Sequence, residues 1–272
     1  MRGRRQTGRA GAARSVAERL APFGLLALLL IVWEALTDLL HVPDFLLPGP
    51  REIWWAGVGE RDQLLSNAIP TAEIAVLGFL LALAFGFGLA AAIRYSRVLE
   101  VALYPIVIAS QTVPVLALAP ILVVLLGFTI LPKLIIVCLI CFFPITVNAV
   151  DGFKSVDPDL VKVMRTLGAG RWWLFREVEL PSALPYVLSG ARVAVTFSVV
   201  GALFGEWVGA SEGLGYLMTQ KQSQFDTGAL FAAMAVLAII GIVLFLLVSL
   251  AGRLLIPWHH GDGRDALTGS PE

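Results

Sequence analysis

The sequence predicts an all-α protein that crosses a membrane about six times. Of its 272 residues, 58% are hydrophobic and 15% are charged, and the mean hydropathy is +0.83. A soluble domain has about a quarter charged residues. The apolar residues gather in blocks of about 20, the length that crosses a hydrocarbon core of ~30 Å. A soluble protein with one large buried core is the alternative, and it does not explain the block length.

Five of the apolar blocks are regular, and one is interrupted by prolines. The expected spans are residues 21–40, 70–93, 101–126, 131–150, 186–208 and 229–252. The first is interpreted as uncleaved, because its apolar run is long and has no A-x-A-like site near its end. The third contains Pro105, Pro114 and Pro120. Proline is tolerated in a span where neighbouring helices or a cavity satisfy the freed carbonyls, which favours a helix lining a pathway. A simple kink is the alternative.

Two shorter features refine this picture. Between the first two spans, the segment FLLPGPREIWWAGV carries Pro48 and Pro50, which enforce an extended turn, and two tryptophans that suit a membrane interface. A short helix along the outer surface is expected there. In the second span, Gly86, Gly88 and residues 90–92 are small and are expected to allow close helix contact.

The basic residues predict an orientation. If the N-terminus is inside, the inner segments hold 16 of the 20 Lys and Arg residues. This is the positive-inside pattern, so both termini are expected in the cytoplasm. The expected organisation is a basic N-terminal tail (1–20), a transmembrane domain (21–255) with an inner loop (151–185), and a cytoplasmic C-terminal tail (256–272). A net charge of zero gives no indication of a nucleic-acid partner.

The inner loop is predicted to form a helix–turn–helix. Asp157 can cap a first helix that has Pro158 at its first position. Its apolar stripe, at i, i+3, i+4 and i+7, consists of Leu160, Val163, Met164 and Leu167. Gly168 is expected to end this helix at positive φ. A second amphipathic turn carries Trp172 and Trp173, and Pro181 is expected to end it. The stripe folds either against the chain's own bundle or into a groove of a soluble partner, and periodicity leaves both open.

The segment GAGRWWLFREVELP (168–181) resembles the loop motif of ABC importer permeases, E-A-A-x3-G-x9-I-x-L-P. The E-A-A positions hold Lys-Val-Met (162–164), a departure that leaves the apolar side of the helix intact. In that family this loop forms coupling helices that lie in a cleft of the ATPase subunit. By resemblance, the coupling residues here are Leu160, Lys162, Val163, Met164, Leu167, Gly168, Ala169, Val178, Leu180 and Pro181.

The resemblance covers about residues 25–255. FLLPGPREIW (45–54) and VGALFGEWVGASEGLGYLM (200–218) resemble the nitrate, sulfonate and taurine permease group. Within this group, residues 140–169 and the run FAAMAVLAIIGIVLF look most like permeases for pyrimidine precursors of thiamine, of hydroxymethylpyrimidine type. Permeases for aliphatic sulfonates, taurine or nitrate share these blocks and are the alternative.

The resemblance implies the type I ABC importer permease fold in the bacterial inner membrane. It also implies three partners: an ATP-binding cassette ATPase, an extracytoplasmic substrate-binding protein and a second copy of this chain. ATP-driven movement of the hairpins would then open the paired bundles alternately to either side. The sequence itself lacks G-x-x-x-x-G-K-[ST], so ATP is expected to bind to a separate subunit.

Catalytic, metal and cofactor sites are not expected in this chain. His41, His259 and His260 lie outside the predicted spans and have no plausible catalytic partner. Cys138 and Cys141 form a C-x-x-C inside an apolar run and are interpreted as small hydrophobic residues rather than as a redox or zinc pair. An intramembrane enzyme would need clustered polar residues at membrane depth.

Polar residues at membrane depth are costly and mark candidate pathway positions. The candidates for the solute pathway are Gln111, Thr112, Asn148, Glu206 and Trp207. Glu206 is alternatively an interfacial carboxylate that packs against the outer loop, and Trp207 an ordinary interfacial tryptophan. Glu73 is a further polar residue near the start of the second span. The glycine-rich loop 209–215 is expected to be a flexible turn that reshapes during opening. A self-contained carrier or channel remains a remote alternative, because it would need no docking hairpin.

Overall fold

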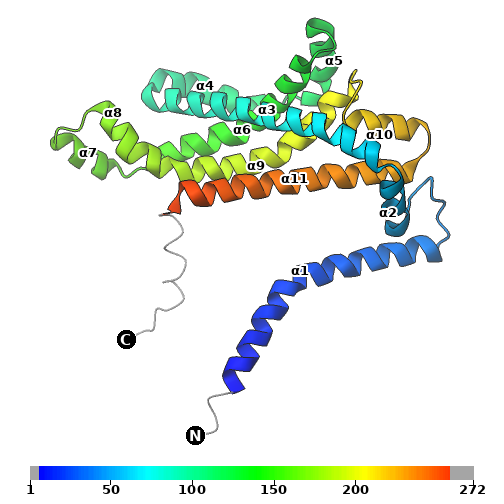
Figure 1. Ribbon diagram of the computed structural model, residues 1–272. Coiled ribbons are helices and arrows are strands. Elements are labelled where there is room, and N and C mark those ends of the chain that lie inside the picture. Colours follow the sequence, from blue (N-terminus) through cyan, green and yellow to red (C-terminus); the bar gives the residue numbers. More distant parts are fainter. Residues whose placement is uncertain (1–5, 258–272) are drawn as a thin grey trace. The chain divides into compact units, whose positions relative to one another are not determined.

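The computed structural model describes residues 6–257, with side chains from residue 20 onward. Within that part of the chain every regular element is helical (Figure 1). His259, His260 and most of the expected C-terminal tail lie outside the described residues. The all-α prediction is confirmed.

The helices follow one another with short connections. In chain order they are α1 (Gln6–Leu39), α2 (Pro50–Gly59), α3 (Arg61–Tyr95), α4 (Arg97–Ser110), α5 (Val115–Leu126), α6 (Ile130–Lys154), α7 (Pro158–Thr166), α8 (Arg171–Leu174), the π-helical turn η1 (Phe175–Glu179), α9 (Leu180–Trp207), α10 (Leu214–Ser223) and α11 (Thr227–Leu255).

Five stretches of helix are long and apolar enough to cross a membrane. They are Leu20–Leu39, Arg61–Tyr95, Ile130–Lys154, Arg171–Trp207 and Thr227–Leu255. A sixth crossing is made if α4 and α5 count as one broken span, because they are bent by 98° at a short break. The prediction of about six spans is therefore confirmed.

The break between α4 and α5 falls at only one of the three prolines in this stretch. Pro114 is the N-cap of α5 and has an extended backbone, whereas Pro105 and Pro120 lie inside α4 and α5. Gln111 and Thr112 lie in the break itself. The segment is thus two helices meeting at a sharp angle, rather than one kinked span.

The chain divides into two compact units. The first comprises the residues up to Arg61 together with Gln220–Ala233, and the second comprises Asp62–Thr219 and the chain from Met234 onward. The second unit has its core where α3, α6 and α9 pack, with buried residues such as Ile74, Val137 and Val195. The helices α6 and α9 lie along each other in Figure 1.

Glycines allow the close packing of this second unit. A Cβ on Gly190 of α9 would lie 2.6 Å from the carbonyl oxygen of Pro144 on α6. A Cβ on Gly86 of α3 would lie 2.9 Å from Thr146 Oγ1, whereas one on Gly88 would meet open space. Of the small residues expected to make helix contacts in α3, Gly86 does so and Gly88 does not.

The first unit is held by polar contacts near the start of α11. Lys221 is buried, and its Nζ donates to Glu60 at 2.7 Å and to Asp226 at 3.3 Å. Burial alone would lower the pKa of Lys221, but these two carboxylates outweigh it and hold that pKa above its usual value. Asp226 also caps α11, because its Oδ1 accepts from Ala229 N–H at 3.1 Å. A short helix is present where one was expected, as α2, with Trp54 and Trp55 exposed.

One local expectation was wrong, and one helix was not predicted. Pro181 does not end a helix, because the chain stays helical from Arg171 to Trp207 and Pro181 lies in the first turn of α9. The π-helical turn just before it widens the backbone, which accommodates a proline that has no N–H to donate. The glycine-rich loop expected over 209–215 is non-helical only as far as residue 213, and α10, which the sequence did not predict, begins at Leu214.

Candidate functional site

The inner loop forms the predicted hairpin. Asp157 caps α7 by accepting from Asp159 N–H at 2.8 Å, and Pro158 takes the first helical position. Gly168 has φ +88°, and Ala169 N–H reaches back to the carbonyl of Met164 at 3.0 Å. This is the left-handed C-terminal closure that glycine makes without strain. Figure 1 shows α7 and α8 at the end of the α6 and α9 pair.

The hairpin presents an apolar surface. Val163 is 53% exposed, Leu167 76% and Trp172 72%. Leu160 and Trp173 are also exposed. Around the turn lies an open hollow of about 410 Å³, lined by Met164, Leu167, Gly168, Ala169, Gly170 and Trp173. An exposed apolar patch with a hollow is typical of a protein contact surface.

The other side of the hairpin packs against its own chain. Val156, Leu174 and Val178 form a small buried cluster, and Met164 packs on it. Of the ten expected coupling residues, Leu160, Lys162, Val163, Leu167 and Gly168 are exposed, while Met164, Ala169, Leu180 and Pro181 are partly buried. Val178 is buried beneath the hairpin. The stripe therefore packs on its own chain at Met164 and is exposed at Leu160, Val163 and Leu167.

An ion pair joins the base of the hairpin to α3. Arg94 Nη2 lies 2.6 Å from Glu179 Oε1, and the Glu179 side chain is only 5% exposed. Glu179 is the last residue of the π-helical turn η1, which connects the hairpin to α9. π-helical turns are rare and are often found at functional sites. Sequence reasoning missed this pair, because residues 94 and 179 are far apart in the chain.

The opposite end of α9 carries a second polar arrangement. The backbone N–H groups of residues 213–215 donate, in order, to Asn67 Oδ1 at 2.8 Å, Thr71 Oγ1 at 2.8 Å and Glu206 Oε2 at 2.7 Å. Thr71 Oγ1 lies 2.8 Å from Glu206 Oε1. We call Asn67, Thr71, Glu206 and these three amides the capping cluster, because the amides belong to the start of α10.

Two polar side chains of the capping cluster are almost completely buried. Thr71 is 0% exposed and Glu206 is 1% exposed. A carboxylate at such a depth is costly unless its hydrogen-bonding groups are satisfied. Both Glu206 oxygens have a partner here. Glu73, which stood out in the sequence as the charged residue of this stretch, is exposed, and its neighbour Thr71 takes the buried position.

The five pathway candidates come from three places. Gln111 and Thr112 are exposed in the break between α4 and α5. Asn148 is partly buried in α6, where its amide donates to the carbonyl of Pro144 at 2.7 Å. Glu206 and Trp207 end α9, and the Trp207 ring is 45% exposed and 5.5 Å from that of Phe204.

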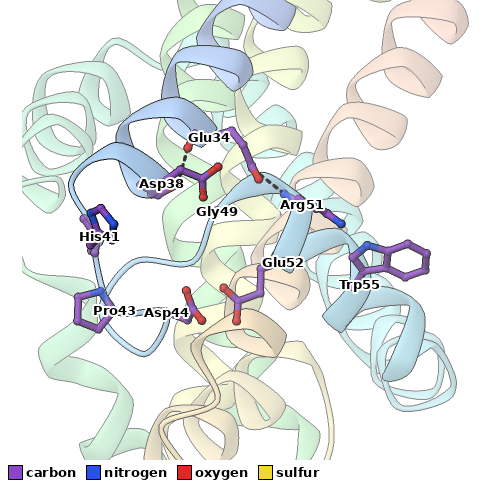
Figure 2. Close-up of a pocket in the computed structure, with 11 residues that line it drawn as sticks. Glu34, Asp38, His41, Pro43, Asp44, Gly49, Arg51, Glu52 and Trp55 are labelled. Carbon is purple, nitrogen blue, oxygen red and sulfur yellow. Dashed lines mark hydrogen bonds between the residues drawn. The ribbon is translucent and has the colours of Figure 1, made fainter.

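The first unit contains an open acidic pocket of about 640 Å³ (Figure 2). Asp38, Asp44 and Glu52 line it, and Glu34 Oε2 accepts from Arg51 N–H at 3.0 Å. Burial, together with the negative charge of Asp44, raises the pKa of Glu52. Within the described residues, no group of three or more His, Cys, Asp or Glu is arranged to hold a metal ion.

The two cysteines are free. Cys141 is buried in the core between α6 and α9, and its Sγ lies 3.1 Å from the carbonyl oxygen of Ala194. Cys138 is partly buried one helical turn before it and packs against the same core. Both behave as the small core residues that the sequence indicated.

The described residues form a multi-span helical bundle with an exposed hairpin, and comparison with known proteins identifies the family. Residues 83–259 match the family described as "Binding-protein-dependent transport system inner membrane component". The chain is 37% identical over 243 residues to the formylaminopyrimidine transport permease protein ThiX of Halalkalibacterium halodurans, covering 89% of this chain and 97% of ThiX.

Other relatives have different named solutes. The riboflavin transport system permease protein RibX of Chloroflexus aurantiacus is 36% identical, with 86% of this chain and 88% of RibX covered. The taurine transport system permease protein TauC of Escherichia coli is 30% identical, with 87% and 88% covered. An inward-facing structure of the MetNI methionine ABC transporter shares the fold, with a TM-score of 0.60 at 18% identity, covering 73% of this chain and 97% of that chain.

The chain belongs to the family of binding-protein-dependent transport system inner membrane components. It is the permease subunit of an ABC importer, as the loop motif indicated. The predicted family and fold are confirmed.

Proposed function

We propose that this permease carries a pyrimidine precursor of thiamine, of hydroxymethylpyrimidine type, into the cell. The observation that carries the proposal is the 37% identity to ThiX over nearly the whole of both chains. The main alternative is an aliphatic sulfonate, taurine or nitrate, supported by the weaker similarity to TauC. Riboflavin is a further candidate because of the similarity to RibX.

The family and the hairpin support the proposed partners. A separate ATP-binding cassette subunit hydrolyses ATP and docks on the exposed stripe of α7, while this chain binds no cofactor. The stripe suits such a partner, because Val163 and Leu167 are more than half exposed and a helix-in-groove contact buries this kind of face. An extracytoplasmic binding protein delivers the solute to the other side.

The permease works as a pair. A single chain of five to six spans encloses only a narrow path, and most of α4 and α5 is exposed in the isolated chain. A second copy covers such apolar surface and completes the path. Gln111, Thr112, Asn148, Glu206 and Trp207 line or shape this path, which opens alternately to either side of the bacterial inner membrane.

The orientation places the hairpin in the cytoplasm. The Lys and Arg residues of the hairpin and of the tails lie on one side under the six-span topology, and this side is the cytoplasmic one by the positive-inside rule. Both termini then lie in the cytoplasm, whereas the start of α10 lies at the outer ends of the spans.

Uptake in the host tests the solute. The gene is deleted in a strain blocked in pyrimidine synthesis for thiamine, and radiolabelled hydroxymethylpyrimidine is supplied at low concentration. We expect uptake to be lost and to return with the intact gene, with unlabelled riboflavin and taurine failing to compete. Uptake that is unchanged by the deletion refutes the pyrimidine assignment, and competition by taurine or riboflavin selects the alternative.

Substitutions in the hairpin test the docking surface. Val163→Asp places a charge on the exposed stripe, so folding is little affected but the apolar contact with the ATPase is lost. We expect the tagged variant to reach the membrane at normal levels and to co-purify with at most about a tenth of the usual ATPase. Arg165→Gln, which lies on the same helix off the stripe, is the matched control. Normal ATPase recovery with Val163→Asp contradicts this docking surface.

A further inference from the structure

The capping cluster supplies hydrogen-bond acceptors to the backbone N–H groups at the start of α10. The first N–H groups of a helix have no partner within the helix, and a buried helix start must find partners elsewhere. Residues 213–215 find theirs in Asn67 and Thr71 of α3 and in Glu206 of α9. Each consecutive amide therefore ties α10 to one of the two spans.

Glycines give the Glu206 side chain the room it occupies. A Cβ on Gly213 would overlap the Glu206 carboxylate, and one on Gly215 would lie 2.9 Å from Glu206 Cβ. Gly213 also has φ +108°, which other residues rarely adopt. The glycines of this loop therefore fit the carboxylate closely, and the backbone between Glu206 and α10 is held by hydrogen bonds instead of being free.

The presence of a carboxylate at position 206 indicates a specific role for this side chain. An apolar side chain would fill the same volume without the desolvation cost of a buried polar group. Glu206 instead accepts from Gly215 N–H and lies within hydrogen-bonding distance of Thr71, whose hydroxyl also accepts from Leu214 N–H. A buried polar network of this kind fixes one arrangement of helices rather than adding general stability.

We propose that Glu206 is a positioning residue. Through the capping cluster it fixes the start of α10 on α3 and α9, and in this way it shapes the opening of the permease on the outer side of the membrane. The proposal rests on the proposed function only for its assignment to the outer side and for its effect on delivery of solute. In this role Glu206 acts through α10 and does not touch solute.

Variants of the capping cluster differ in which of its hydrogen bonds they keep. In Glu206→Gln the amide oxygen accepts from Gly215 N–H, and the amide nitrogen donates to Thr71 Oγ1, whose hydroxyl turns to the carbonyl of Asn67, 3.1 Å away. Every partner stays satisfied. In Glu206→Ala and in Thr71→Val, amides at the start of α10 lose their acceptors. Glu212→Gln changes an exposed carboxylate of the same loop and is the matched control.

Amide hydrogen exchange of the purified full-length chain in lipid nanodiscs tests the first part. We expect exchange in residues 213–215 to become at least about tenfold faster in Glu206→Ala and in Thr71→Val. Glu206→Gln and Glu212→Gln should stay within about twofold of the unmodified chain, and exchange in the α6 and α9 core should not change. Unchanged exchange at 213–215 in Thr71→Val overturns the proposal, as does a rise spread over the whole chain. Thr71→Val decides this part if Glu206→Ala fails to fold.

A coupled assay tests the second part. In the reconstituted transporter, Glu206→Ala should raise the concentration of liganded binding protein needed for half-maximal ATPase stimulation by about fivefold or more. Local loosening of α10 without this shift overturns the positioning role. Because the exchange measurement uses no solute, failure of the pyrimidine assignment would appear only as missing uptake in the unmodified transporter.

Discussion

The ion pair between Arg94 and Glu179 shows what single residues do at the base of the hairpin. Glu179 is almost fully buried, so removal of Arg94 leaves an uncompensated charge inside the protein. Arg94→Ala should therefore destabilise the chain by about 3 kcal/mol, as measured by denaturation in detergent micelles followed by circular dichroism.

A neutral partner provides the control for this pair. The double variant Arg94→Ala with Glu179→Gln should recover most of the loss, because the buried charge is gone. The two substitutions would then be strongly non-additive in a double-mutant cycle. Additive effects, or an unfolding midpoint that Arg94→Ala leaves unchanged, would refute the structural importance of this ion pair.

The acidic pocket of the first unit predicts a pH effect. Burial and the charge of Asp44 raise the pKa of Glu52 above 4.5 in the folded chain, so folding penalises its charged form. As the pH falls from 7 toward 4.5, Glu52 is protonated more readily in the folded state than in the unfolded state, and folding is favoured. Glu52→Gln should raise the thermal midpoint at pH 7 and should reduce the gain in stability on acidification. Both changes in stability should be less than about 1 kcal/mol because the pocket is open. A larger gain in stability on acidification in Glu52→Gln than in the unmodified chain would contradict the predicted direction.

Individual polar residues were only partly predictable. Glu206 was identified from the sequence because a carboxylate in an apolar run is conspicuous, with an alternative role against the outer loop. Its partner Thr71 was missed, because a threonine in a span is unremarkable and Glu73, two residues later, carries the charge. Which of the two faces inward depends on how α3 packs, and the local sequence does not contain that information.

At the scale of helices, close packing predicts which glycines resist change. A Cβ on Gly78 of α3 would lie 2.5 Å from Val137 Cβ of α6, whereas one on Gly88 meets open space. Gly78→Ala should cost about 1–3 kcal/mol through overpacking. Gly88→Ala, in the same helix, should be neutral or stabilise by up to about 1 kcal/mol. Thermal unfolding of both variants in detergent checks this, and equal effects would contradict the packing of α3 on α6.

The helices themselves were predictable where the sequence supplied a local signal. Capping by Asp157, the positive φ of Gly168 and the apolar stripe of α7 all follow from short-range chemistry. The continuation through Pro181 did not, because the sequence carries no local signal for the π-helical turn before it. Helix α10 was missed, although Leu214, Leu217 and Met218 are apolar at helical spacing and are buried. The glycines before it suggested a loop.

For the whole molecule, hydropathy predicted the number of spans. A segment that crosses lipid must be a helix that satisfies its own backbone hydrogen bonds, so each span is visible in the sequence as a long apolar run. The sharp angle between α4 and α5 was not predictable, since only one of the three prolines marks the break. The division into two compact units arises from long-range contacts, such as those of Lys221 with Glu60, that periodicity does not reveal.

If a partner docked on the hairpin hydrolyses the ATP that drives transport, then this chain moves solute uphill only in the presence of ATP and of that partner. The most direct measurement is accumulation of radiolabelled hydroxymethylpyrimidine by liposomes that contain this chain, its ATPase subunit and its binding protein. We predict accumulation above the external concentration with ATP on the hairpin side, and none without ATP or with Val163→Asp. Uptake that reaches only equilibrium and does not depend on ATP would contradict the claim and indicate a self-contained carrier.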